Sequence, residues 1–269
     1  MRRQGQNLLM PDKQHLTILT GASRGLGLAL AQQILARAEP QHLLCISRRP
    51  DPALDALARG SGHRLEAWSQ DLADTEATAQ RLADWLAQQD RGRHASATLI
   101  NNAGVLAPLR SAADTDAAAL VQVLRVGLEA PLLLAGAFLR GTRDWSARQR
   151  AGVRLLNISS GLGRRGMAGS AAYCAAKAGL DNASRALALE ESGQPWPAAR
   201  IVSLAPGVID TDMQAQLRAG DPAEFPEHQR FVDLQRNGTL WSADVAARAI
   251  LQWLARADFG SKVVADVRD

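Results

Sequence analysis

Short apolar runs alternate with longer alanine-rich stretches along the whole chain. The short runs consist mainly of aliphatic residues and end at Gly, Ser, Asn or Pro, which is typical of strands buried in a parallel sheet. The longer stretches have the composition of helices. Strands and helices in this repeated order predict a doubly wound α/β fold, in which a parallel sheet carries helices on both faces. The seven predicted strands cover residues 16–20, 43–47, 64–69, 98–101, 153–159, 200–204 and 262–264.

The length and the hydrophobic content predict a single domain. A chain of 269 residues that is 46% hydrophobic can bury one sizeable core. We expect residues 1–15 to form a flexible N-terminal extension and residues 16–269 to form the domain. The apolar run 131–139 is far shorter than the ~20 residues of a membrane span, and we expect neither a span nor a signal peptide.

Cysteine and histidine usage predicts neither a disulfide framework nor a metal site. Cys45 and Cys174 belong to no paired motif, and the five histidines are dispersed along the chain. A reducing cytoplasmic location fits these free cysteines.

Three glycines, Gly21, Gly25 and Gly27, separate the first predicted strand from a helical stretch at 28–38. Glycine lets the backbone approach a phosphate closely, and the helix that follows directs free N–H groups toward the anion. This spacing is a weak signal by itself, but its position between a strand and a helix is the context that a dinucleotide site requires.

Tyr173 is the only tyrosine of the chain, and Lys177, one of three lysines, follows it by four positions. The stretch 170–191 is free of proline and rich in helix formers, so both side chains lie on one helix face. An isolated pair of this kind is usually a tyrosine with a solvated lysine neighbour. An ammonium ion beside a phenol favours the phenolate, however, and would let Tyr173 act as an acid or base near neutral pH.

Small and polar residues follow three further predicted strands. They are Asn102 to Gly104 after strand 98–101, Ser160 after strand 153–159, and Pro206 with Gly207 after strand 200–204. Each alone could be an ordinary turn. Because the carboxyl ends of parallel strands meet at one edge of a sheet, we expect these groups to gather there.

Taken in this order, the motifs make the chain resemble the short-chain dehydrogenase/reductase family from residue 16 to the end. TGASRGLG, NNAG and the Tyr173–Lys177 spacing match that family's glycine turn, amide motif and Y-x-x-x-K. The resemblance implies a Rossmann-type fold and hydride transfer between a nicotinamide and a substrate carbon. It also implies that Tyr173 exchanges a proton with the substrate oxygen, that Ser160 holds that oxygen, and that Lys177 lowers the tyrosine pKa and binds the nicotinamide ribose.

The family also supplies expectations about assembly and cofactor contacts. A homodimer or homotetramer is implied, built through the helix of Tyr173 and the helix that follows Gly104. The implied cofactor-binding residues are Gly21, Ser23, Arg24, Gly25, Leu26, Gly27, Ser47, Arg48, Arg49, Asp71, Leu72, Asn102, Ala103, Gly104, Pro206, Gly207 and Thr211.

Charge at the end of the second predicted strand favours NADPH over NADH. An NAD site usually has an acidic residue about 20 positions beyond the glycine turn, where this chain has Ser47, Arg48 and Arg49. Arginine matches phosphate geometry, so this pair should bind the 2′-phosphate, with Arg24 as a possible second cation. The alternative is an arginine pair that is simply solvated.

The substrate side rests on weaker signals. A lid is expected at about 208–241, where Met213, Leu217, Phe225, Phe231 and Leu234 could line a pocket, although most of them fit the buried face of short helices better. The segments PGVIDTDMQ and NGTL resemble the branch of sepiapterin reductases and bacterial benzil reductases, which implies reduction of a ketone or a vicinal dicarbonyl. The candidate substrate contacts are Leu162, Met213 and Asp266.

Three further features of the sequence, at Asp266, at Arg164 with Arg165 and at Gly127, each admit two interpretations. Asp266 aligns approximately with the aspartate that anchors the pterin in sepiapterin reductases, or it is a polar strand-end residue. Arg164 and Arg165 could attract an anionic substrate, but a solvated rim is favoured. Gly127 stands where many family members carry an asparagine of the proton relay, and it predicts a local kink or close packing, with catalysis preserved through another water path.

Other functions stay open at this point. A reductase of 3-oxoacyl thioesters or other ketones is the alternative within the family. A cofactor-binding regulator without chemistry is supported only by Gly127. The pI of 9.7 invites a nucleic-acid partner, but the net charge is only +4 and the arginines are scattered, so we expect none.

Overall fold

A computed structural model describes residues 13–150 and 152–269, which form a seven-stranded parallel sheet with helices on both faces. The strand order β3-β2-β1-β4-β5-β6-β7 confirms the predicted Rossmann-type fold. The strands are β1 (Gln14–Thr20), β2 (Gln41–Ser47), β3 (Arg64–Ser69), β4 (His94–Asn101), β5 (Val153–Ile158), β6 (Arg200–Ala205) and β7 (Val264–Asp266).

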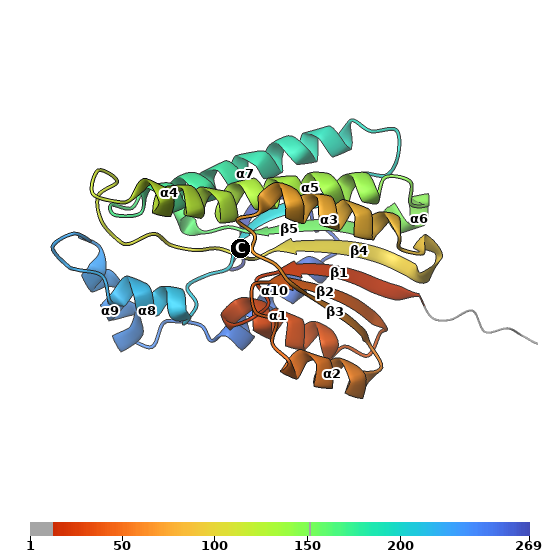
Figure 1. The fold of residues 1–269 in the computed structure, drawn as a ribbon, viewed down its shortest axis with the longest axis horizontal. Coiled ribbons are helices and arrows are strands. Elements are labelled where there is room, and N and C mark those ends of the chain that lie inside the picture. The colour runs from red at the N-terminus through yellow and green to blue at the C-terminus, as the bar shows by residue number, and fades with distance from the viewer. Residues whose placement is uncertain (1–12, 151) are drawn as a thin grey trace, which may run out of the picture.

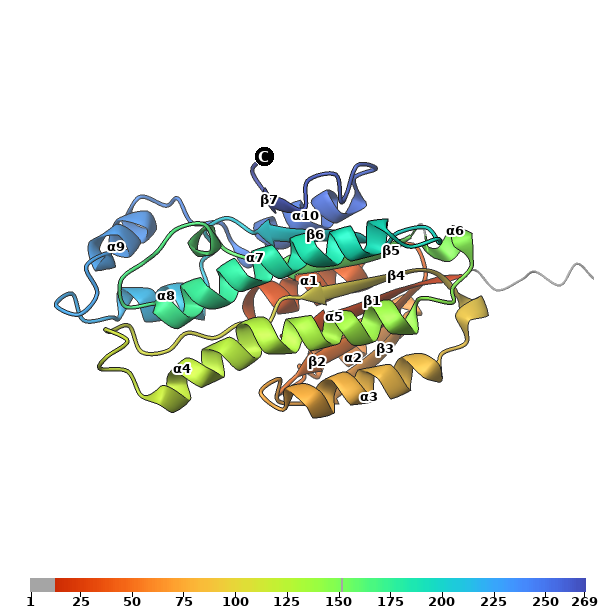
Figure 2. The ribbon, with the colours of Figure 1, turned by 90° about the horizontal axis from the view of Figure 1, so that it is seen from above.

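Helices cover the two faces of the sheet as separate layers (Figures 1 and 2). One layer contains α1 (Gly25–Leu35), α2 (Ala53–Ser61) and α10 (Ala243–Ala255), and the other contains α3 (Thr75–Ala87), α4 (Ala117–Leu124), α5 (Ala130–Gly141) and α7 (Ala171–Ser192). Each layer buries its own apolar core against the sheet. The strands are apolar on both sides because both faces are covered.

The lid contains two short helices, α8 (Asp212–Arg218) and α9 (His228–Arg236), beyond the carboxyl ends of the strands. Leu217, Phe225 and Phe231 are buried there in a third apolar cluster with Leu109 and Met167. Leu217 on α8 and Phe231 on α9 are buried as expected for short helices, whereas Phe225 lies between these helices. Leu217 and Phe231 also line the cavity described below, as do Met213 and Leu234, so both interpretations of the apolar lid residues apply.

The predicted boundaries need correction at several ends. The strand β1 begins two residues before its predicted start, and α1 begins inside the glycine turn, at Gly25. The last strand is shifted from 262–264 to Val264–Asp266, because Val264 pairs with Ser203 and Asp266 with Ala205. The chain still turns at Gly260, where φ is +96°. The predicted extension 1–15 lies mostly outside the described residues.

Gly127 lies in a π-helical turn, Arg125–Glu129, between α4 and α5. A Cβ atom at Gly127 would lie 3.1 Å from the Cβ of Ala176 on α7. Both predicted reasons for the glycine therefore apply, since the helix is locally distorted and α7 approaches closely.

Within the described residues, the segment Ala117–Gly141 is long and apolar enough to cross a membrane by length and composition alone. Helices inside water-soluble proteins have the same composition. This segment packs on α3 and α7, with part of its outer face exposed at Val121, Leu124 and Leu132.

Candidate active site

The carboxyl ends of the strands and the lid enclose a cavity of about 580 Å³. This is the edge of an open α/β sheet at which ligands bind. Arg49 is exposed and does not line the cavity. All other predicted site residues do line it, namely Gly21, Ser23, Arg24, Gly25, Leu26, Gly27, Ser47, Arg48, Asp71, Leu72, Asn102, Ala103, Gly104, Ser160, Leu162, Tyr173, Lys177, Pro206, Gly207, Thr211, Met213 and Asp266.

The glycine turn is built so that the backbone can face an anion. Gly21 and Gly25 have φ values of +73° and +53°, a region that favours glycine. A Cβ atom on Gly27 would lie 2.0 Å from the carbonyl oxygen of Gly21, so only glycine lets α1 begin this close to the strand. The Asn102 side chain donates to the carbonyl oxygens of Thr20 and Gly21 at 3.0 and 3.3 Å and fixes the turn. The free N–H groups at the start of α1 are thereby presented to the cavity.

The lysine of the Tyr-x-x-x-Lys pair is deeply buried. Lys177 is 4% exposed, and its Nζ donates to the carbonyl oxygen of Ile158 at 2.7 Å. The Nζ atom lies 5.7 Å from the ring centre of Tyr173. Burial lowers the pKa of Lys177 to about 8, while the carboxylate of Asp181 acts in the opposite direction.

The pKa of Tyr173 differs from the sequence-based expectation. Desolvation raises it to about 12, and a hydrogen bond with Ser160 offsets only part of that rise. The effect of Lys177 on this pKa stays a prediction, since its Nζ atom bonds to Ile158 and lies 5.7 Å from the ring centre of Tyr173 in this structure. Tyr173 holds its proton at neutral pH, as a proton donor must.

The cavity lining also contains a cation and buried polar atoms without hydrogen-bond partners. Arg48 lines the cavity, and no acidic group among the described residues lies within ion-pair distance of it. Ser47 and Ser159 also line the cavity, and their buried hydroxyls have no hydrogen-bond partner in the described part of the chain, although buried polar groups normally have one. Arg24 lines the cavity as predicted but pairs with Asp212 at 2.9 Å.

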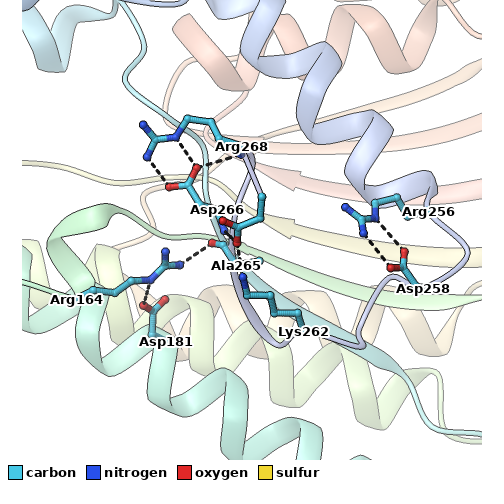
Figure 3. Close-up of polar contacts among 9 residues, drawn as sticks. Arg164, Asp181, Arg256, Asp258, Lys262, Ala265, Asp266 and Arg268 are labelled. Atoms are coloured by element: carbon cyan, nitrogen blue, oxygen red, sulfur yellow. Dashed lines mark hydrogen bonds and ion pairs between the residues drawn. The ribbon is translucent and has the colours of Figure 1, made fainter.

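Near the lid, apolar and charged side chains line the cavity together. Leu162 and Met213 lie there with Leu106, Met167 and Phe231, and so do Arg165, Arg230 and Arg268. Asp266 also lines the cavity, but Arg268 donates to both of its carboxylate oxygens at 2.7 Å, as Figure 3 shows. This pairing lowers the pKa of Asp266.

The two arginines before α7 are exposed, as the rim interpretation expects, but both also have partners. Arg164 donates to the carbonyl oxygen of Ala265 at 2.5 Å, and its Nε lies 3.6 Å from Asp181 (Figure 3). Arg165 makes two hydrogen bonds to Glu227 of the lid, at 2.8 and 2.9 Å. Both arginines are therefore engaged in tertiary contacts, which local sequence could not show.

The sequence reasoning did not single out Asp181 or Arg268. Asp181 follows Tyr173 by eight positions and Lys177 by four, so helical periodicity places it on the same face of α7. That signal was present in the sequence. The sequence contained no comparable signal for Arg268, because the turn after β7 brings it to its partner, Asp266. In the described parts of the chain, no group of three or more His, Cys, Asp or Glu side chains could hold a metal ion.

A dinucleotide-sized cavity, a glycine turn at a helix start and a half-buried phenol with a buried lysine define an oxidoreductase of the nicotinamide-dependent class. The chain belongs to the short-chain dehydrogenase family, whose model matches residues 15–222. It is 34% identical to a benzil reductase ((S)-benzoin forming) of Bacillus cereus over 90% of this chain and 94% of the relative. It is 32% identical to the sepiapterin reductase of Bos taurus over 94% of both chains.

A solved structure supports the same membership. The KRED1-Pglu enzyme shares 30% sequence identity with this chain and superposes with a TM-score of 0.73. The match covers 92% of this chain and 99% of that one. Enzymes of this family bind NAD or NADP, so the residues around the cavity fit the cofactor class that the family uses.

Proposed function

We propose that this protein is an NADPH-dependent carbonyl reductase that acts on a ketone or vicinal dicarbonyl, with Tyr173 as the proton donor. The observation that carries the proposal is that Ser160, Tyr173 and Lys177 line the same cavity as the glycine turn. The apolar side chains near the lid and the relationship to benzil reductases support the dicarbonyl class. The domain would span residues 16–269, with the lid at about 208–241.

The residues divide the chemistry among them. A bound reduced nicotinamide supplies the hydride for the substrate carbon. The Ser160 hydroxyl holds the carbonyl oxygen, and Tyr173 gives that oxygen a proton as negative charge develops on it. The ammonium group of Lys177 stabilises the phenolate left behind. The apolar side chains of Leu162 and Met213 exclude water from the reacting centre.

Arg48 is proposed to select NADPH, and its neighbour Arg49 provides a matched control. We expect Arg48→Gln to raise the KM for NADPH about tenfold or more, because a cation facing the 2′-phosphate is lost. The KM for NADH should hardly change, since NADH lacks that phosphate. Steady-state kinetics with both cofactors measures this selectivity.

Arg49→Gln removes the same charge outside the cavity and should leave both constants close to those of the wild type. Equal effects of the two substitutions on both cofactors would contradict a specific phosphate contact.

Benzil-like diketones are favoured over pterins by the state of Asp266. An amino-heterocycle would use this carboxylate as a hydrogen-bond acceptor and would have to compete with Arg268, which donates to both oxygens. A flat, uncharged diketone needs only the apolar wall and the groups that hold its carbonyl oxygen.

A substrate panel tests the proposed function. NADPH oxidation would be compared with NADH oxidation against benzil, sepiapterin, diacetyl, a β-ketoacyl thioester and a steroid ketone. We expect benzil with NADPH to give the highest kcat/KM. A preference for the thioester would move the assignment to a 3-oxoacyl reductase, and no turnover with any ketone would favour a cofactor-binding regulator.

Assembly into a homodimer or homotetramer is part of the proposal. The family assembles through the helices that correspond to α4–α5 and α7, and here Val121, Leu124, Leu132 and Leu189 expose apolar side chains on these helices. A cytoplasmic location remains a prediction from the free cysteines.

A further inference from the structure

Asp181 is a buried carboxylate one helical turn beyond Lys177 on α7. Its side chain is 3% exposed. A carboxylate at this depth is costly unless charge and hydrogen bonds compensate for the loss of water. Its surroundings therefore show what it does.

Two partners hold the Asp181 carboxylate from different elements. Ser203 on β6 donates to Oδ1 at 2.6 Å. The Oδ2 atom accepts no hydrogen bond within the described residues, and the Nε of Arg164 lies 3.6 Å from it. A single neutral donor and one looser ion pair leave the negative charge incompletely compensated.

The loop before α7 approaches this carboxylate through a glycine. A Cβ atom on Gly163 would lie 2.9 Å from the carbonyl oxygen of Lys177 and 3.0 Å from Oδ2 of Asp181. Gly163 therefore lets Arg164 reach both Asp181 and the carbonyl oxygen of Ala265 on β7 (Figure 3). The loop, the helix and the last strand meet at this carboxylate.

The charged groups near Asp181 identify its role. On its own helix Asp181 lies one turn beyond the buried Lys177, and from the loop before α7 the guanidinium group of Arg164 approaches it. The strand β6 contributes only the neutral Ser203. On β7, Arg268 pairs with the acidic Asp266 and offsets its charge, so Asp266 contributes little to the electrostatic potential at Asp181. Of the two cations, Lys177 and Arg164, only Lys177 is buried. Its only hydrogen bond within the described structure goes to a neutral carbonyl group.

We propose that Asp181 is a positioning residue for the Tyr173–Lys177 pair: its buried carboxylate keeps Lys177 in the ammonium form, and Ser203 and Arg164 fix that carboxylate in place. The inference rests on the proposed function, because it gives the ammonium ion a task in proton transfer. Without this carboxylate, burial would favour the neutral amine, which cannot stabilise a phenolate. The direction of the shift at Lys177, where Asp181 opposes the effect of burial, agrees with this role.

Nuclear magnetic resonance of the lysines tests the proposal without requiring turnover. The chain has only three lysines, so labelling with 13C at Cε gives three signals, and Lys177→Arg identifies the one from Lys177. In the wild type we expect this signal to titrate near pH 8. In Asp181→Asn, which keeps the shape and an acceptor for Ser203, the midpoint should fall by about one pH unit or more. The alkaline limit of NADPH turnover should move down with it.

Ser203→Ala is the matched control, since it removes the hydrogen bond but keeps the charge. It should shift the midpoint by less than half as much as Asp181→Asn. An unchanged Lys177 midpoint in folded Asp181→Asn would overturn the proposal. If that variant does not fold, Asp181→Ser serves the same measurement, and a wild-type midpoint below pH 7 would also overturn it. A lack of turnover by the wild type would instead refute the proposed function, while the titration still decides the role of Asp181.

Discussion

Substitution of Tyr173 by phenylalanine should lower kcat for ketone reduction with NADPH about 1,000-fold, because the phenol is the only acidic group placed to protonate the product oxygen in this proposal. The substitution removes one oxygen atom from a side chain that contacts the cavity, so the fold should persist. The measurement is NADPH absorbance with benzil, at saturating cofactor, beside circular dichroism of both proteins. Binding of NADPH should change little.

The neighbouring Cys174→Ala is a suitable control for the tyrosine substitution. Cys174 lies on the same helix, is half-buried and does not line the cavity. Its loss should leave kcat within about threefold of the wild type, as expected for a side chain outside the reacting groups. A phenylalanine variant that retained a tenth of the wild-type kcat would exclude the phenol as the principal proton donor.

Gly27→Ala should give the second large effect, on both stability and cofactor binding. The added Cβ atom would lie 2.0 Å from the Gly21 carbonyl oxygen and 2.6 Å from the Asn102 amide nitrogen, so the turn or α1 must move. Crowding of this kind typically costs about 1–3 kcal/mol of the free energy of unfolding. Since the displaced helix start faces the cofactor, NADPH affinity should fall more than tenfold. Urea unfolding and NADPH fluorescence titration measure the two losses.

Gly60→Ala separates this clash from the general effect of replacing a helical glycine. Gly60 lies in α2 with no atom within 4 Å of an added Cβ, so alanine should stabilise the protein by about 0.5–1 kcal/mol. Should Gly27→Ala bind NADPH as tightly as the wild type, the close approach of α1 to the strand would have no part in cofactor binding.

The sequence predicted the fold well because most of the strands contain a short apolar run that ends at a turn residue. The predicted β3 matches the observed strand, and only the last strand is misplaced as a whole. The error at β7 has a physical reason, since a three-residue edge strand is defined by its pairing with β6 and not by its own composition. Similarly, the π-helical turn at Gly127 depends on how closely α7 approaches, which is a tertiary property.

The residues that line the cavity could be predicted where they belong to sequence motifs. Their ion pairs and pKa values could not be predicted. Local spacing placed Tyr173 and Lys177 correctly, but it could not show that the ammonium group bonds to Ile158 or that desolvation raises the pKa of the phenol. Local spacing also could not distinguish Arg48 from Arg49, because the backbone conformation at the strand end decides which of the two side chains lines the cavity. Charges acquire their effect from partners that are distant in the sequence, as with Arg164 and Asp181.

The strand order has a consequence for biosynthesis. Once β1, β2 and β3 have paired, the sheet grows from the other side of β1 by adding β4, β5, β6 and β7 in the order in which they are translated. Each new strand can pair with an edge strand that has already been synthesised, so the sheet can assemble during translation without a partner from later in the chain. The contact between Arg164 and the carbonyl oxygen of Ala265 forms later than these steps, because it joins the loop before α7 to the last strand of the sheet.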